Sequence, residues 1–146
     1  MARFLADNNF ELLEQPLAKD DLEGLRALRN RSPLPIIADE SCMNASDIPR
    51  LDGAVHGINI KLSKCGGLAE ARRMVHEARR RDMKVMLGCM IESSLGITAA
   101  AHLAPLVDYA DLDGAALLED DPFRGATIED GMIRLPVEPG LGVRLR

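Results

Sequence analysis

Five short β-type runs recur at nearly constant intervals along the chain, and this repeat limits the fold more than any other feature. The runs are residues 10–14, 35–39, 57–62, 84–88 and 109–113. The residues taken to mark the carboxyl end of each run are 25, 22, 27 and 23 positions apart; they are Glu14, Asp39, Lys61, Gly88 and Asp111. Each interval has room for a crossover helix, which adjacent parallel strands require. The repeat predicts successive βα units and a parallel sheet of the α/β class.

The intervals carry apolar residues at helical spacing. Leu22, Leu25 and Leu28 predict one helix, with Asp20 or Asp21 as its N-cap. A second helix is predicted from Leu68 to Ala78, and residues 93–106 are apolar nearly all round, as expected of a helix packed against the sheet. The segment after Asp47 has only a weak helical pattern.

Length and charge restrict the class of protein. A chain of 146 residues with 47% hydrophobic residues is sufficient for one domain, so we expect residues 1–146 to form a single unit. The formal charge of -5 argues against a nucleic-acid partner, and the basic run 79–81 is interpreted as a solvated helix end. No apolar run is long enough to cross a bilayer and no signal peptide is recognisable, so we expect a cytoplasmic protein without a membrane partner. The three cysteines lack a disulfide or zinc spacing.

The pattern changes after Gly114. Residues 10–114 carry the βα repeat, whereas residues 115–146 are interrupted by proline and glycine. Residues 128–133 predict a hairpin around the dipeptide Asp130-Gly131, a common two-residue turn. We therefore expect a C-terminal tail rather than a further βα unit.

Charged residues mark the carboxyl ends of four of the five runs. Parallel strands place these ends on one edge of a sheet, where barrels of this kind hold their active sites. Glu14 and Asp39 would offer hard oxygen ligands suited to Mg²⁺. Lys61, on the next strand, would lie beside the metal. Lys64 is the nearest alternative candidate for this lysine. The sequence therefore predicts two candidate Mg²⁺ ligands and a neighbouring lysine at one edge of the sheet.

Four motifs in this order resemble the C-terminal barrel segment of the enolase superfamily, muconate-lactonizing subgroup. They are Leu13-Glu14-Gln15-Pro16, Ile37-Ala38-Asp39-Glu40-Ser41, Asn59-Ile60-Lys61-Leu62 followed by Gly66-Gly67, and Met90-Ile91-Glu92-Ser93. The resemblance implies a partial (β/α)₇β barrel containing strands four to eight. It implies that Glu14 and Asp39 are metal ligands on strands four and five, and that Lys61 is the acid/base of strand six.

Asp111 and Asp113 narrow the resemblance to the dipeptide epimerases. Residues two apart on a strand face the same way, so both carboxylates would favour a cationic group on the ligand. The resemblance implies that they hold the α-ammonium of a dipeptide such as Ala-Glu, with Met90 and Ile91 also at the substrate. The implied reaction is a 1,1-proton transfer at the α-carbon of the C-terminal residue.

The same resemblance implies parts that the sequence lacks. The family carries a Lys-x-Lys motif on strand two, a further Asp ligand on strand three, and a capping domain. We therefore expect weak or absent Mg²⁺ binding and no epimerisation by this chain alone.

Other interpretations remain open from the sequence. Glu14 and Asp39 could be turn or cap residues, and Asp111 and Asp113 could cap the turn at Gly114. The chain could be a non-catalytic half-barrel that forms homo-oligomers through its open edges, or a muconate- or o-succinylbenzoate-type member of the superfamily.

Overall fold

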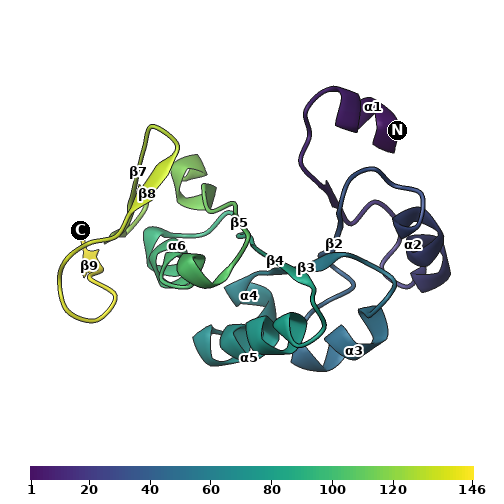
Figure 1. Ribbon diagram of the computed structural model, residues 1–146. Coiled ribbons are helices and arrows are strands. Elements are labelled where there is room, and N and C mark those ends of the chain that lie inside the picture. Colours follow the sequence, from purple (N-terminus) through teal and green to yellow (C-terminus); the bar gives the residue numbers. More distant parts are fainter.

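A five-stranded parallel sheet forms the centre of the computed structural model, which describes residues 1–146 (Figure 1). Its strands are β1 (Leu13–Glu14), β2 (Ile36–Ala38), β3 (Gly57–Ile60), β4 (Lys84–Leu87) and β5 (Tyr109–Ala110). They follow one another in the sheet in sequence order, and every neighbouring pair is parallel. The predicted α/β class with a parallel sheet is confirmed, and the sheet is open, with β1 and β5 at its edges.

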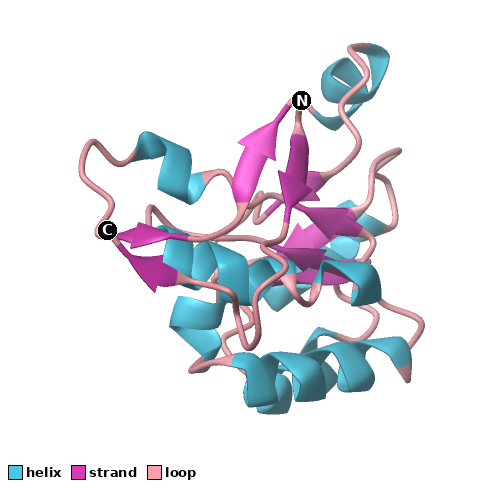
Figure 2. Ribbon diagram, turned by 90° about the vertical axis from the view of Figure 1, so that its left-hand side faces the viewer, coloured by secondary structure: helices cyan, strands magenta, loops and turns pink.

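Helices connect the strands, mostly as crossovers. They are α2 (Leu22–Arg29), α3 (Ile48–Leu51), α4 (Leu62–Cys65), α5 (Leu68–Arg79) and α6 (Ser94–Ala101), with α1 (Ala2–Asp7) before the sheet. Short 3-10 turns are η1 (Ala45–Asp47), η2 (Ala104–Leu106) and η3 (Gly114–Leu117). Asp21 caps α2, because its carboxylate accepts from the Gly24 amide at 2.8 Å. Figure 2 shows the helical layer beside the strands. Neither α1 nor α4 was predicted from the sequence.

The hydrophobic core lies between the sheet and these helices. Ile36 and Ala38 of β2 and Ile58 and Ile60 of β3 belong to one cluster of 21 buried residues. The alternate residues, among them Ile37 and Asn59, point to the other face of the sheet, because side chains alternate along a strand. That second face carries the strand-end polar groups. The fold therefore separates an apolar, helix-covered face from a face that is available for chemistry.

All five predicted strands are longer than the observed ones, since Pro35 and Asp39 also flank β2 and Gly88 follows β4. Residues 10–12 and 111–113 lie outside β1 and β5, and Lys61 and Leu62 follow β3. The residues just before β1 and just after β5 are at the sheet's edges, where a ladder has a partner on one side only. The predicted helix over 93–106 is divided into α6 and η2, because Pro105 cannot donate a helical hydrogen bond.

The tail forms two small antiparallel pairs. β6 (Phe123–Arg124) pairs with β9 (Arg144–Leu145), and β7 (Thr127–Glu129) pairs with β8 (Met132–Arg134). The second pair is the predicted hairpin, and its turn residues Asp130 and Gly131 have φ values of 50° and 74°. Positive φ values at both residues are characteristic of the type I′ turn, whose twist matches that of the flanking strands. None of the helices in the protein is long and apolar enough to cross a membrane.

Candidate active site

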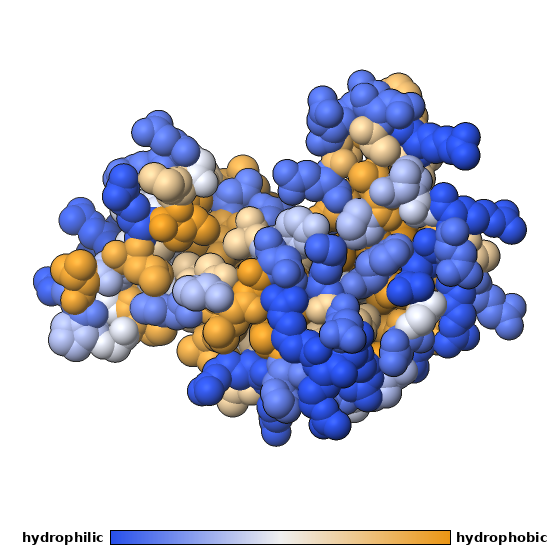
Figure 3. Space-filling view, viewed as in Figure 1, coloured by the Kyte–Doolittle hydropathy of each residue, from blue (hydrophilic) through white to orange (hydrophobic).

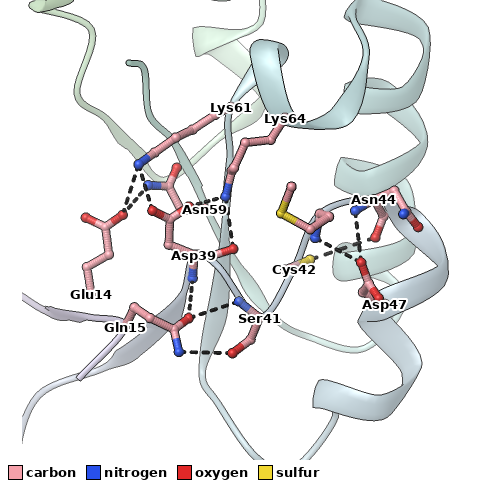
Figure 4. A network of polar contacts seen from close by, with 11 residues as sticks. Glu14, Gln15, Asp39, Ser41, Cys42, Asn44, Asp47, Asn59, Lys61 and Lys64 are labelled. Carbon is pink, nitrogen blue, oxygen red and sulfur yellow. Dashed lines mark hydrogen bonds and ion pairs between the residues drawn. The ribbon is translucent and has the colours of Figure 1, made fainter. Parts of the chain in front are cut away.

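Three charged side chains come together where β1, β2 and β3 end (Figure 4). Glu14 is the last residue of β1, Asp39 directly follows β2, and Lys61 directly follows β3. The parallel ladder explains their proximity, since it brings successive carboxyl ends to one edge. The structure therefore places the three residues as the repeat in the sequence suggested.

Lys61 bridges the two carboxylates. Its Nζ lies 2.7 Å from Oδ2 of Asp39 and 3.7 Å from Oε1 of Glu14. The Lys61 side chain is 14% exposed and that of Asp39 is 7% exposed, so this pair is shielded from bulk water. The interpretation of Glu14 and Asp39 as turn or cap residues is not supported, because neither carboxylate accepts a backbone hydrogen bond.

Lys64 supplies a second ammonium group. Its Nζ contacts Oδ1 of Asp39 and donates to the Asp39 carbonyl oxygen at 2.9 Å. Both oxygens of Asp39 therefore face a lysine, whereas only Lys61 also approaches Glu14. The geometry distinguishes the two competing lysines: Lys61 lies between the carboxylates and Lys64 lies on the far side of Asp39.

These contacts set the charge states at the strand ends. Burial alone would raise the pKa of Asp39, but hydrogen bonds from Lys61 and Lys64 and their positive charges outweigh it, and the pKa lies below its ordinary value of 3.8. Burial would lower the pKa of Lys61, but its hydrogen bond to Asp39 and the charges of Asp39 and Glu14 raise it above 10.5. The resting site is therefore a carboxylate paired with ammonium groups.

Gln15 fixes the loops that carry the two carboxylates. Its Oε1 accepts from the backbone amides of Asp39 and Ser41, at 2.9 and 3.2 Å. Its Nε2 donates to the Leu17 carbonyl oxygen and to the Ser41 hydroxyl, both at 2.9 Å. The backbone of Gln15 has a φ of 35°, a conformation that side-chain-bearing residues rarely adopt. Four hydrogen bonds offset this strain.

Asn59 belongs to the same cluster, although the sequence was not interpreted in that way. It lies on β3 two residues before Lys61, and its Nδ2 donates to Oε1 of Glu14 at 2.6 Å. Its position was the available signal, because residues two apart on a strand share a face. Asn59 lies 1% exposed, so its contact with Glu14 is a buried one.

The residues present fit part of a magnesium site. Glu14 and Asp39 offer hard carboxylate oxygens from adjacent strand ends, which suits Mg²⁺. No group of three or more His, Cys, Asp or Glu side chains lies close enough to hold a metal ion. Glu14 and Asp39 are therefore the two carboxylates that would hold such an ion, together with ligands from outside this cluster.

The four residues predicted to bind substrate lie after β4 and β5. Asp111 and Asp113 are exposed on either side of the buried Leu112, but they follow β5 rather than lying within a strand as predicted. Neither carboxylate makes a side-chain hydrogen bond, so Asp113 does not cap η3 with its side chain. Met90 and Ile91 are 53% and 67% exposed. No hydrogen bond or ion pair joins these four residues to the Glu14, Asp39 and Lys61 cluster.

Cys89 connects the segments after β4 and β5. A Cβ atom added to Gly114 would lie 3.1 Å from the Cys89 sulfur, so the two segments are in contact there. Burial, together with the charges of Asp111, Asp113 and Glu92, raises the pKa of the Cys89 thiol. The thiol therefore stays protonated and unreactive at neutral pH.

The fold and the strand-end cluster define a C-terminal barrel segment with an acidic and lysine-bearing edge. Residues 1–146 match the family described as Enolase C-terminal domain-like, and the chain belongs to that family. It is 47% identical over 135 residues to the L-Ala-D/L-amino acid epimerase of Flavobacterium johnsoniae. This alignment covers 92% of the chain and 40% of the relative's length.

Two solved structures have the same fold. The dipeptide epimerase of Cytophaga hutchinsonii, complexed with Mg and D-Ala-L-Val, matches 99% of this chain and 41% of its own, with a TM-score of 0.91 and 35% identity. The substrate-liganded L-Ala-D/L-Glu epimerase of Bacillus subtilis matches 97% of this chain and 42% of its own, with a TM-score of 0.89 and 37% identity. The chain thus spans about 40% of the length of the relatives that it matches.

Proposed function

We propose that this chain contributes the Glu14, Asp39 and Lys61 side of a dipeptide epimerase active site. The observation that carries the proposal is the position of Lys61, whose Nζ lies 2.7 Å from Asp39 and 3.7 Å from Glu14. Epimerases among the chain's relatives support the reaction class. The strands would correspond to strands four to eight of a complete barrel.

Glu14 and Asp39 would hold the metal, one ion per complete site. When bound, Mg²⁺ would supply positive charge beside the substrate carboxylate, which lowers the barrier to removing the neighbouring α-proton. As the ammonium described above, Lys61 would return a proton from Nζ to the α-carbon, so that an N–H bond breaks as a C–H bond forms; in the opposite direction, Lys61 would first release a proton and then take the α-proton as a neutral amine. Lys64 would keep Asp39 charged and oriented.

Asp111 and Asp113 would bind the α-ammonium of the dipeptide. Both carboxylates are exposed and neither has a protein partner, so both can accept hydrogen bonds from a cation. Met90 and Ile91, exposed on the adjacent segment, would contact apolar parts of the same substrate. Muconate- and succinylbenzoate-type substrates carry no such cation, which makes them the weaker alternative.

Epimerisation needs a second acid/base on the opposite face of the α-carbon. The Lys-x-Lys pattern expected for that role does not occur in this sequence. We therefore propose that the chain alone does not epimerise dipeptides. Deuterium incorporation into Ala-Glu in D₂O with Mg²⁺, measured by NMR, should be undetectable, and a clear rate would contradict this.

A chimera tests the assigned roles directly. This chain would replace the matching segment of the Bacillus subtilis epimerase, to which it is 37% identical. With Mg²⁺ the chimera should exchange the α-proton of Ala-Glu, and Lys61→Ala should lower the rate at least 100-fold. Lys84→Ala is the matched control, because Lys84 lies at the amino end of β4 and should leave the rate unchanged. A Lys61→Ala chimera with full activity would contradict the proposal.

A non-catalytic role is the second candidate. The unpaired edges at β1 and β5 could pair with a second copy of the chain, which favours a homo-oligomer. The solution mass, measured by light scattering, would distinguish this candidate, since a monomer would contradict it. The cytoplasmic location and the absence of nucleic-acid and membrane partners stay predictions.

A further inference from the structure

Asn59 is a buried polar residue, and only one of its two side-chain amide atoms has a hydrogen-bond partner. Its Nδ2 donates to Glu14 Oε1 at 2.6 Å, whereas its Oδ1 is buried and has no hydrogen-bond partner. An unpaired buried acceptor is costly, on the order of 1–3 kcal/mol, so its presence needs an explanation. Turning the amide over would bring Oδ1 against a carboxylate oxygen, which is worse. The orientation is therefore set by Glu14.

The contact between Asn59 and Glu14 spans the strand between them. Asn59 lies on β3 and Glu14 on β1, with β2 in the middle of the three. Lys61 also approaches the same Glu14 oxygen, but from 3.7 Å, which is a looser contact than the 2.6 Å hydrogen bond. The Glu14 side chain is 33% exposed, so the surrounding protein covers it only in part. The hydrogen bond from Asn59 is the shorter of its two polar contacts.

Gly88 makes room for this amide. A Cβ atom at Gly88 would lie 2.6 Å from Nδ2 and 2.7 Å from Oδ1 of Asn59, so any side chain at this position would force the Asn59 amide to move. The backbone of Gly88 does not have the positive φ that would itself require glycine. The absent side chain, rather than the backbone conformation, therefore matters at this position.

We propose that Asn59, in the space left by Gly88, is a positioning residue that orients the Glu14 carboxylate. This inference rests on the proposed metal-binding role of Glu14. The hydrogen bond at Oε1 restricts rotation of the side chain and leaves Oε2 free for another partner. Groups that orient metal ligands in this way commonly change metal affinity about 10- to 100-fold when removed.

The primary test needs no metal. NMR relaxation of the Glu14 side-chain carbons would be measured in the metal-free chain and in Asn59→Val and Gly88→Ala. We expect the Glu14 side chain to be ordered in the parent chain and mobile in both variants. Asn59→Val should also leave the melting temperature unchanged or raised, because it removes the unpaired acceptor. A Glu14 side chain that stays ordered in both variants would overturn the proposal.

Mn²⁺ titration followed by electron paramagnetic resonance separates this inference from the proposed function. If the parent chain binds Mn²⁺, both variants should raise the Kd about 10-fold. An unchanged Kd would count against Asn59. If the parent chain binds no Mn²⁺, as two carboxylates without further protein ligands would allow, the NMR result alone decides the positioning role, and the metal-binding role of Glu14 is tested by the same titration of the chimera. Thr98→Val is the matched control for loss of a buried polar group, because Thr98 contacts Ser94 and Ala126 instead. It should lower the melting temperature without mobilising Glu14.

Discussion

The parallel sheet buries its central strands, whereas the tail of residues 115–146 exposes most of its side chains. Every residue of β2 and β3 is buried, but every residue of β7 is exposed. Among residues 115–146 the one buried residue is Asp121, a charged one. Figure 3 shows apolar side chains at the surface on the left, where Figure 1 places the tail. The sheet is thus stabilised by apolar burial and the tail by turns and hydrogen bonds.

The largest expected loss of stability tests whether apolar burial stabilises the sheet more than the tail. Ile58→Ala removes a fully buried side chain from the core cluster and should lower the free energy of unfolding by about 3 kcal/mol, because it leaves a cavity. Denaturant unfolding followed by circular dichroism measures the loss. The matched variant Ile128→Ala removes a 41% exposed side chain from β7 and should cost less than about 1 kcal/mol. Equal losses would mean that the tail also depends on apolar burial.

A smaller effect is expected where the tail contacts α6. Oδ2 of Asp121 accepts from the Ser94 amide at 2.7 Å and from the Ser94 hydroxyl, and Oδ1 accepts from the Phe123 amide at 3.0 Å. Asp121→Ala should therefore cost about 1.5 kcal/mol, as expected for loss of a helix cap. Thermal unfolding at pH 7 measures it.

The same residue predicts a pH dependence. Burial would raise the pKa of Asp121, but hydrogen bonds from Ser94 and Phe123 outweigh it and hold the pKa below 3.8. Its contribution to stability is then complete above about pH 4 and is lost as the pH falls through the lowered pKa. The parent chain should lose this stability in acid, whereas Asp121→Ala should not. Parallel acid titrations of the two proteins would contradict the assignment.

The smallest effect belongs to the exposed hairpin. Arg134 lies 3.1 Å from Glu129, and the two side chains are 60% and 59% exposed. Glu129→Gln should lower the free energy of unfolding by only about 0.3 kcal/mol, since water screens such pairs. Urea unfolding at low and high salt would detect it. A salt-independent loss above about 1 kcal/mol would show that this pair stabilises the tail more than its exposure suggests.

Sequence reasoning was most successful where one periodic pattern governs the structure. The spacing of strand ends predicted the parallel sheet, and it predicted that Glu14, Asp39 and Lys61 would lie together. The turn chemistry of Asp130-Gly131 predicted the hairpin. In each case the local rule and the final contacts agree.

Contacts between distant residues were not predictable in this way. The hydrogen bond from Asn59 to Glu14 joins residues 45 positions apart; strand alternation places Asn59 on the same face as Lys61 but does not identify Glu14 as its partner. The contact of Lys64 with Asp39 depends on the short helix α4, which has too few residues for a periodic pattern. The limits of β1 and β5 were overestimated because the alternation of apolar and charged residues typical of a strand continues beyond the ladder, through residues 10–12 and 111–113.

One amide group fixes how far apart the two acidic strand ends stand. Gln15 follows Glu14 directly, and its side chain binds the backbone on either side of Glu40, at Asp39 and Ser41. Separating the loops would break several hydrogen bonds at once, so the loops should shift together or not at all. If the two loops move, they would then move together, and the distance between the Glu14 and Asp39 carboxylates would stay the same.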